Sequence, residues 1–190
     1  MRRVVILLMC VFLFCGCSSQ RIEKSRLEKL KGSFDSSTYI NGYFNISASF
    51  DSSWQIMDVE DNGSKGTSFV VFYAQKDYGL QSVNISIEDV NYNDGEEDLI
   101  YIVWNSLKKD LKNSGVDLVS ENIEEFDYRG NKAFQIDTQG SLLTNEKKIV
   151  DAYVRQYVFE KNRYLAIITL ASLNENRIQE LSSCFNHLNR

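Results

Sequence analysis

Four segments of strand type follow one another in the second half of this chain, with no helical segment between them. They lie near Val116–Phe126, Ala133–Thr138, Ile149–Phe159 and Tyr164–Ala171. The glycine-containing stretch Tyr128–Asn131 predicts a turn between the first two. Consecutive strands joined by short connections pair in antiparallel fashion, because a parallel pair needs a long crossover, usually a helix. This order restricts the chain to folds with a largely antiparallel sheet.

Three further strands are expected earlier in the chain. From Tyr43 to Phe50 apolar residues alternate with polar ones, as in a strand with one buried face. Phe69–Ala74 is apolar throughout and predicts a central strand of the sheet. Val83–Glu88 alternates again. We therefore expect a sheet of about six or seven strands.

An amphipathic helix is predicted between the two groups of strands. Asp94 and Glu97 form a capping pair at its start, and Asn113–Gly115 supplies its end. Between them apolar residues recur at spacings of three and four, which is the pattern of one buried helical face. These residues are Leu99, Ile102, Val103, Leu107 and Leu111.

A second helix is predicted at the end of the chain. Its start is marked by the capping box Ser172–Glu175. An apolar stripe then continues to the terminus through Ile178, Leu181, Phe185 and Leu188. Because helices and strands do not alternate regularly, the fold class is α+β: a largely antiparallel sheet with a midchain helix and a C-terminal helix packed on it.

The order of these elements resembles the Mog1/PsbP-like α/β/α sandwich. The resemblance covers residues 40–190 and rests on the strand Tyr43–Phe50, on Trp54 shortly after it, and on the two helices and the long strands. That group commonly carries Pro and Gly before the tryptophan, whereas this chain has Ser52 and Ser53. The fold serves unrelated roles, including protein binding and photosystem assembly, so the resemblance implies a fold and no specific activity.

The first sixteen residues have the parts of an export signal. Arg2 and Arg3 give a positively charged start, Val4–Phe14 is apolar without interruption, and Gly16 is a small residue at the expected cleavage point. A helical run of this length rises about 16 Å, which is too short for a hydrocarbon core of about 30 Å. We expect residues 1–16 to be removed and the protein to lie outside the cytoplasm.

The stretch from Phe14 to Cys17 resembles the bacterial lipobox, in which a small residue precedes a lipid-modified cysteine. Phe14 stands where the lipobox usually has leucine. The resemblance implies diacylglycerol on the sulfur of Cys17, and therefore a lipid anchor to the membrane on the extracytoplasmic side of a bacterial cell envelope. The alternative is an ordinary secretory signal that is cleaved without lipidation.

The mature chain is expected to have two parts. Residues 17–40 comprise the lipidated cysteine and a polar, serine-rich tether, and residues 41–190 form a single α+β globular domain. The alternative for the first part is that Ile22, Leu27 and Leu30 pack onto the domain.

Charge and cysteine content exclude some partners and some crosslinks. The chain has 21 basic and 26 acidic residues, a net charge of −5, and loss of the two arginines of the signal would bring it to −7. This balance opposes nucleic acid as a partner. Of the four cysteines, two leave with the signal and Cys17 would carry lipid, so Cys184 is the one thiol left and no intramolecular disulfide is expected.

No cofactor, metal site or catalytic residue is predicted. The one histidine, His187, lies near Cys184 on the last helix, and two ligands do not make a zinc site. Asp58–Gly63 has the first half of a calcium loop, but position twelve, where a glutamate should stand, is Phe69. We interpret the histidine as a helix-end residue and the acidic segment as a loop or hairpin.

One cluster of carboxylates could supply an acid and a base, namely Glu121, Glu124, Glu125 and Asp127. Alternation along a strand places Glu121 and Glu125 on one face and Glu124 on the other. A solvated strand edge that discourages aggregation is the favoured interpretation.

These features favour a non-catalytic lipoprotein that binds a protein or another component of the envelope. The ten tyrosines suit such a role, because tyrosine offers contact area with a polar tip. Two alternatives are an extracytoplasmic enzyme with a carboxylate-based site around Glu121–Asp127 and a passive envelope assembly factor.

Overall fold

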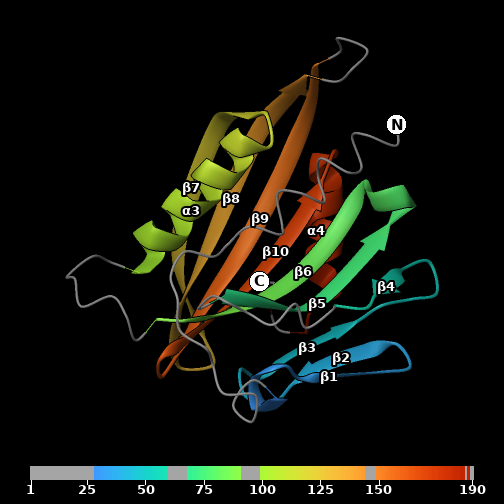
Figure 1. Cartoon of the computed structure of the whole chain (residues 1–190), viewed down its shortest axis with the longest axis vertical. Coiled ribbons are helices and arrows are strands. Elements are labelled where there is room, and N and C mark those ends of the chain that lie inside the picture. The colour runs from blue at the N-terminus through green and yellow to red at the C-terminus, as the bar shows by residue number, and fades with distance from the viewer. Residues whose placement is uncertain (1–27, 60–67, 91–98, 144–148, 187, 189–190) are drawn as a thin grey trace.

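The computed structural model of the protein describes residues 28–59, 68–90, 99–143, 149–186 and 188 (Figure 1). The strands are β1 (Ser33–Asp35), β2 (Thr38–Asn41), β3 (Ile46–Ser49), β4 (Gln55–Met57), β5 (Ser68–Lys76), β6 (Gln81–Asp89), β7 (Val116–Tyr128), β8 (Asn131–Leu143), β9 (Ile149–Lys161) and β10 (Tyr164–Ser172). The helices are α3 (Leu99–Asn113) and α4 (Glu175–Ser183), and a 3₁₀ turn, η1 (Asp77–Gly79), joins β5 to β6.

Seven of the strands form one antiparallel sheet in the order β4-β5-β6-β10-β9-β8-β7. The turn predicted at Tyr128–Asn131 is confirmed: Arg129 and Gly130 both have positive φ, 55° and 81°, as a two-residue hairpin turn requires. The predicted α+β class with a largely antiparallel sheet is confirmed.

The prediction that Phe69–Ala74 forms a central strand is wrong, because β5 lies next to the edge and only the short β4 separates it from solvent. A β-bulge explains the misleading apolar run. The pairing of β5 with β6 shifts between Val70 and Phe72, so the strict two-residue alternation is interrupted there. Phe69, Val71, Phe72 and Ala74 all contribute to the same apolar cluster as a result.

The remaining three strands form a small sheet in the order β1-β2-β3. Leu30 and Tyr39 are 2% and 1% exposed and belong to the main apolar cluster, and the Tyr39 hydroxyl donates to the Lys31 carbonyl at 2.8 Å. Of the three residues in the packing alternative, Leu30 therefore packs onto the domain, whereas β1 after it is exposed. Ile22 and Leu27 lie outside the described residues.

Helix α3 buries one apolar stripe against the sheet. Its fully buried apolar side chains are Ile100, Val103, Trp104, Leu107 and Leu111. Trp104 takes the place that the sequence pattern gives to Ile102, which is only partly buried. The helix ends as predicted, since Gly115 has a φ of 75° and the Ser114 amide donates to the Asp110 carbonyl. The start predicted near Asp94 lies outside the described residues.

Helix α4 is shorter than the stripe that predicts it. Its cap is Asn174, whose side chain accepts a hydrogen bond from the Asn176 amide at 3.0 Å. The helix ends at Ser183, and Phe185 then forms a bridge with Ala48 in β3. Phe185 and Leu188 are nevertheless buried, as the stripe predicts, because the segment turns back onto the core.

The two helices lie on opposite faces of the large sheet (Figure 1). On one face α4 and the small sheet enclose an aromatic-rich cluster that includes Tyr39, Phe50, Phe72 and Phe159. On the other face α3 covers a mainly aliphatic cluster at the β7 end of the sheet. No helix in the described ranges is both long and apolar enough to span a bilayer.

Candidate functional site

Three strands of the large sheet are longer than their neighbours. β7, β8 and β9 have 13 residues each, whereas β6 and β10 have nine. Ser172, the last residue of β10, pairs with Tyr153 of β9, so β9 extends beyond β10. We call the extending parts, residues 116–119, 140–143 and 149–152, the overhang. On one face α3 covers the overhang, where Val116, Leu142 and Ala152 are buried.

On the α4 side, the same three strands change from apolar to polar along their length. The register aligns residues of β7, β8 and β9 in rows across the sheet. From the Arg129–Gly130 turn toward the overhang the rows are Phe126/Ala133/Phe159, then Glu124/Gln135/Tyr157, then Asn122/Asp137/Arg155, then Ser120/Gln139/Tyr153. The first row lies in the apolar core, and the last two are polar apart from the tyrosine ring.

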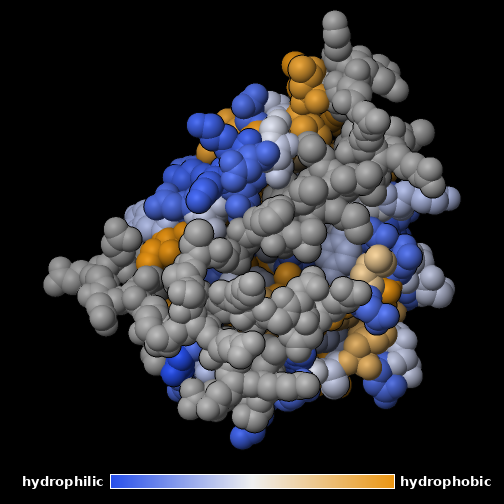
Figure 2. All heavy atoms as spheres, in the orientation of Figure 1, coloured by the Kyte–Doolittle hydropathy of each residue, from blue (hydrophilic) through white to orange (hydrophobic). Residues whose placement is uncertain are grey.

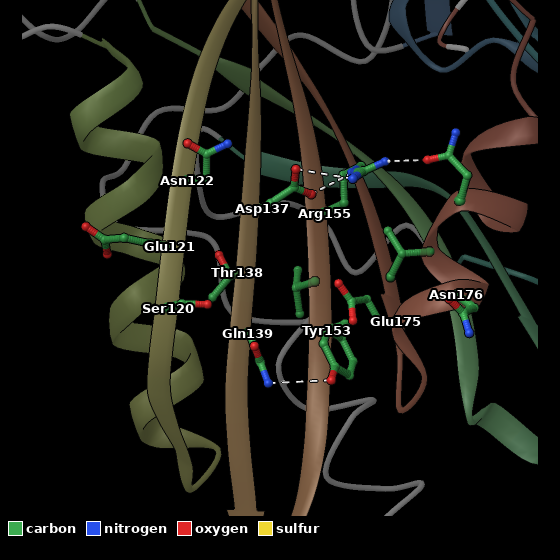
Figure 3. A pocket seen from close by; sticks show the side chains of 13 residues that line it. Ser120, Glu121, Asn122, Asp137, Thr138, Gln139, Tyr153, Arg155, Glu175 and Asn176 are labelled. Carbon is green, nitrogen blue, oxygen red and sulfur yellow. Dashed lines mark hydrogen bonds and ion pairs between the residues drawn. The ribbon is translucent and has the colours of Figure 1, made fainter. Parts of the chain in front are cut away.

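The polar rows form the floor of a groove of about 530 Å³, and α4 forms one wall (Figure 3). The lining residues on the strands are Ser120, Glu121, Asn122, Asp137, Thr138, Gln139, Tyr153, Val154 and Arg155. Those on the helix are Glu175, Asn176, Ile178 and Gln179. The groove exists because α4 packs on β9 and β10 and leaves the polar rows of β7 and β8 uncovered.

Arg155 organises the centre of the groove. Its Nε donates to Asp137 Oδ1 at 2.5 Å and its Nη2 to Asp137 Oδ2 at 3.2 Å, which is a bidentate ion pair. Its Nη1 donates to Gln179 Oε1 of α4 at 3.1 Å, so the guanidinium ties helix to sheet (Figure 3). Gln135 donates to Asp137 Oδ2 at 2.6 Å. The pair is thus held in one geometry from three elements.

Tyr153 marks the overhang end of the groove. Its hydroxyl accepts a hydrogen bond from Gln139 Nε2 at 3.5 Å, as Figure 3 shows. Desolvation raises the pKa of Tyr153, and the negative charges of Asp151 and Glu175 raise it further. Glu175 stands in the first turn of α4, where the helix dipole favours a carboxylate. This end therefore combines an aromatic ring with nearby negative charge.

The groove suits recognition of a polar ligand or segment. Its one positive charge, Arg155, is neutralised by Asp137. The amides of Asn122, Gln139 and Asn176 supply both donors and acceptors of hydrogen bonds, with the Tyr153 ring as an apolar contact. Such a surface can bind by hydrogen bonding and shape.

The carboxylates singled out in the sequence lie along β7 and are all exposed. As expected, Glu121 and Glu125 share one face and Glu124 lies on the other, since they pair with Thr138, Phe134 and Gln135 respectively. Glu121 lines the groove only from the rim, with its side chain directed toward α3 (Figure 3).

Each of the other three carboxylates makes a contact of its own. Glu125 pairs with Lys132 at 3.0 Å, and Glu124 accepts from Asn122. Asp127 accepts from the Gly130 amide in the turn.

Other residues considered from the sequence lie away from the groove or outside the described residues. Cys184 is half-buried at the end of α4, and His187 lies outside the description, as do Cys17 and most of the acidic segment after Asp58. Burial raises the pKa of the Cys184 thiol, with a further contribution from the charge of Asp51. No group of three or more metal-ligating side chains occurs in the part of the chain that the structure describes.

Sequence reasoning missed Asp137, Arg155 and Gln139. A usable signal exists: Gln135, Asp137 and Gln139 are polar at every second position of a strand whose other face begins with the apolar Phe134 and Ile136. The predicted strand ends at Thr138, whereas β8 continues to Leu143, so Gln139 falls outside the predicted strand.

No protein-family model matches the chain, and a search of curated proteins returns no match. Among solved structures, the chain is similar to the cyanobacterial PsbP of Synechocystis, with a TM-score of 0.54 and 14% identity over 82% of this chain and 95% of that chain.

Two further structures are more distant. The Ran-binding protein Mog1p of Saccharomyces cerevisiae has a TM-score of 0.45 and 8% identity over 82% of this chain and 97% of that one. LpqN of Mycobacterium tuberculosis, a protein involved in cell envelope biogenesis, has a TM-score of 0.38 and 14% identity over 74% and 77%. At these identities the similarity concerns the fold alone, and the fold of this chain is similar to that of PsbP.

Proposed function

We propose that the mature protein is a non-catalytic binding module, anchored by lipid on Cys17 at the extracytoplasmic side of a bacterial membrane. Its groove across β7, β8 and β9 would bind a protein or another component of the cell envelope. The export-type N-terminus and the lipobox-like Phe14–Cys17 support the anchor. The groove supports the binding role.

The observation that carries the binding role is the polar floor of the groove. A strand face next to an apolar core usually continues it, yet here Asn122, Gln139 and Tyr153 replace apolar residues where the cover by α4 ends. The Arg155–Asp137 pair holds this floor in a fixed shape. A pre-formed surface binds with a smaller ordering cost than a mobile one.

The contacts of the carboxylates argue for binding over acid–base catalysis. A general acid and base must converge on one reacting group. Here Glu125 pairs with Lys132, Asp127 holds a turn, and Glu121 and Glu124 lie on opposite faces of β7. Asp137, the carboxylate at the centre of the groove, is occupied by Arg155.

A matched pair of variants tests the groove. Membranes that contain the wild-type protein are treated with a mild crosslinker, and the products are identified by mass spectrometry. In the variant Asn122→Ala/Gln139→Ala/Asn176→Ala we expect the specific crosslinked partner to be lost, because three groups that face the ligand are removed.

The control is Asn105→Ala, an exposed position on α3 at the other side of the sheet, which should keep the partner. Unfolding curves show that each variant is folded before it is compared. Repeated recovery of no specific partner, or equal recovery by the groove variant and the wild type, would count against the proposal.

The anchor has a separate test. Mass spectrometry of the mature protein should find an acylated N-terminal Cys17, and Cys17→Ser should prevent lipid attachment and processing at that residue. An unmodified N-terminus at another position would disprove the anchor and leave the groove proposal standing.

A further inference from the structure

β7 is an edge strand of unusual length for an uncovered edge. It is the last strand of the seven-stranded sheet and, among the strands that the structure describes, pairs only with β8. In an antiparallel ladder, alternate residues of an edge strand direct their N–H and C=O groups away from the sheet. Ser120 to Glu125 are exposed apart from Ile123, so no other described element covers this edge. A ladder of hydrogen-bonding groups therefore faces solvent.

Negative charge protects this edge against pairing with β7 of a second copy of the protein. Proteins block exposed edges with bulges, proline, lysine or short strand length. β7 has a bulge between Leu118 and Ser120, which leaves a regular segment from Ser120 to Tyr128. Within that segment stand four acidic residues, Glu121, Glu124, Glu125 and Asp127, and no basic residue. Pairing of β7 with a second copy would set these carboxylates against one another.

The same charge favours one class of foreign strand. Opposite charges across neighbouring strands stabilise a ladder, whereas like charges destabilise it. Lys132 forms an exposed ion pair with Glu125 at 3.0 Å and lies opposite Asp127 in the ladder, whereas Glu121 and Glu124 have no ion pair within the described part of the chain. A lysine- or arginine-rich extended segment would therefore find both backbone hydrogen-bonding groups and the charges of Glu121 and Glu124 at this edge.

Exposed apolar residues lie near one end of β7 and predict where an apolar residue of the partner would bind. Val119 and Leu118, at the bulge just before the regular segment, are 58% and 42% exposed. Leu143 and Ile149, at the tip of the β8–β9 hairpin, are 65% and 75% exposed, and Figure 2 shows apolar atoms gathered at that tip. An apolar residue of the added strand would lie at this end, with the basic residues along Glu121 to Asp127.

We propose that β7 is a docking edge that accepts a basic, extended protein segment as an eighth strand of the sheet. This mode of recognition obtains affinity from the main-chain ladder and selectivity from the side chains. The docking proposal rests on the backbone edge of β7, whereas the proposed function rests on the groove, so each proposal can be disproved without the other. The partner would be a protein and not a glycan, because the ladder needs a peptide backbone.

The probe for the test is a capped nine-residue peptide that alternates lysine with threonine or valine. The full chain, purified as the cell makes it, is titrated with the peptide, and amide hydrogen exchange is followed in residues 120–127. Within the described ranges, the outward-facing amides of β7 have no ladder partner. They should exchange at least tenfold more slowly with peptide bound, and binding should weaken as salt is added.

Two comparisons make the result specific. Glu121→Gln/Glu124→Gln/Glu125→Gln should weaken binding about fivefold to tenfold, since each exposed charge pair contributes modestly. The control Asp35→Asn/Glu160→Gln/Glu180→Gln removes the same charge at exposed sites off β7 and should bind like the wild type. A peptide with proline in place of each valine, which cannot complete the ladder, should not bind.

The proposal is overturned if the exchange of residues 120–127 is unchanged at saturating peptide, or if the edge variant and the charge-matched control bind equally. The groove variant Asn122→Ala/Gln139→Ala/Asn176→Ala should still slow exchange along β7 when peptide is added. Loss of the envelope partner in that variant with normal peptide binding would separate the groove from the edge.

Discussion

The α4 side of the large sheet has a closed half and an open half. Over β6 and β10 the side chains are apolar and fully covered, and Ile85, Ile168 and Leu170 have no exposed surface. Over the rows Asn122/Asp137/Arg155 and Ser120/Gln139/Tyr153 the side chains are polar apart from the tyrosine ring, and the groove lies above them. Both halves share one backbone ladder, so the difference lies entirely in the side chains and in what packs on them.

The closed half of the sheet contributes mainly to stability, and the open half forms the candidate binding surface. Burial of apolar area stabilises the closed half by about 25 cal/mol for each Å² removed from water. The open half obtains its order from the strand ladder, from α3 on its other face, and from the Arg155–Asp137 pair. We therefore expect substitutions in the closed half to affect mainly stability and those in the open half mainly binding.

The largest expected effect is that of Phe185→Ala. This ring is 1% exposed and lies 6.4 Å from the Phe50 ring in the closed half. Its removal should lower the free energy of unfolding by about 3–5 kcal/mol, because a large cavity is left. Urea unfolding followed by circular dichroism measures it.

The matched control for this prediction is Gln139→Ala in the open half, which should change stability by less than about 0.5 kcal/mol. Similar losses for the two variants would remove the distinction between the halves.

A smaller loss is expected for Gly140→Ala, because one position of the open half is tightly packed from the α3 side. A methyl group on Gly140 would lie 2.3 Å from Val116 Cγ1 and 3.2 Å from the Asp117 carbonyl oxygen. The clash should cost about 1–3 kcal/mol. When Val116 is already alanine, the methyl group of Gly140→Ala has more room. The step from Val116→Ala to Val116→Ala/Gly140→Ala should therefore cost less stability than Gly140→Ala costs in the wild type. Equal costs in the two backgrounds would show that the contact with Val116 is not the cause.

Asp137→Ala should have an intermediate to small effect. The Arg155 side chain is 18% exposed and would lose both bonds of its ion pair. We expect a loss of about 1–2 kcal/mol, reduced by the water that reaches this partly open site. Thermal unfolding measures the loss, and Asp137→Asn should lose less because it keeps an acceptor. If Asp137→Ala were more stable than the wild type, the Arg155–Asp137 pair would not stabilise the fold and would serve only to shape the groove.

The smallest effect concerns the reactivity of Cys184 at the border of the closed half. Its pKa is raised by burial and then by Asp51, so less thiolate is present near neutral pH than in an unfolded chain. Alkylation of the folded protein should be slower than that of the urea-unfolded protein and should reach its maximum at higher pH. The unfolded thiol ionises first, so this group should lower stability slightly as pH rises above its ordinary pKa. Equal rates in both states would contradict the closed packing around α4.

The elements of the fold were largely predictable because their signals are local. The alternation at Phe44–Phe50, the glycine turn after Tyr128 and the helical stripe around Leu107 each depend on neighbours in sequence, and the structure confirms all three. The bulge at Val71 was not predictable, since it depends on pairing with β6. The strands β1 and β2 have only three and four residues, which is too few to show a period.

The candidate site was not predictable in the same way. Asp137 and Arg155 are 18 residues apart, and Gln179 is a further 24 residues from Arg155. Only the register of β8 with β9 and the placement of α4 bring them together. The carboxylates of β7 were visible in the sequence, but their position on the edge of the sheet required the strand order.

The bridge between Phe185 and Ala48 constrains when the domain can finish folding. The Asn186 amide donates to the Ser47 carbonyl, and the Asn186 side chain donates to the Ser47 hydroxyl across 139 residues of sequence. The contact of β3 with residues 185 and 186 thus joins segments far apart in the sequence. Non-local contacts of this kind slow folding. Residues 185 and 186 must leave the ribosome or a membrane channel before β3 gains this neighbour, so a growing chain makes this contact late, after the local pairs of the small sheet are available.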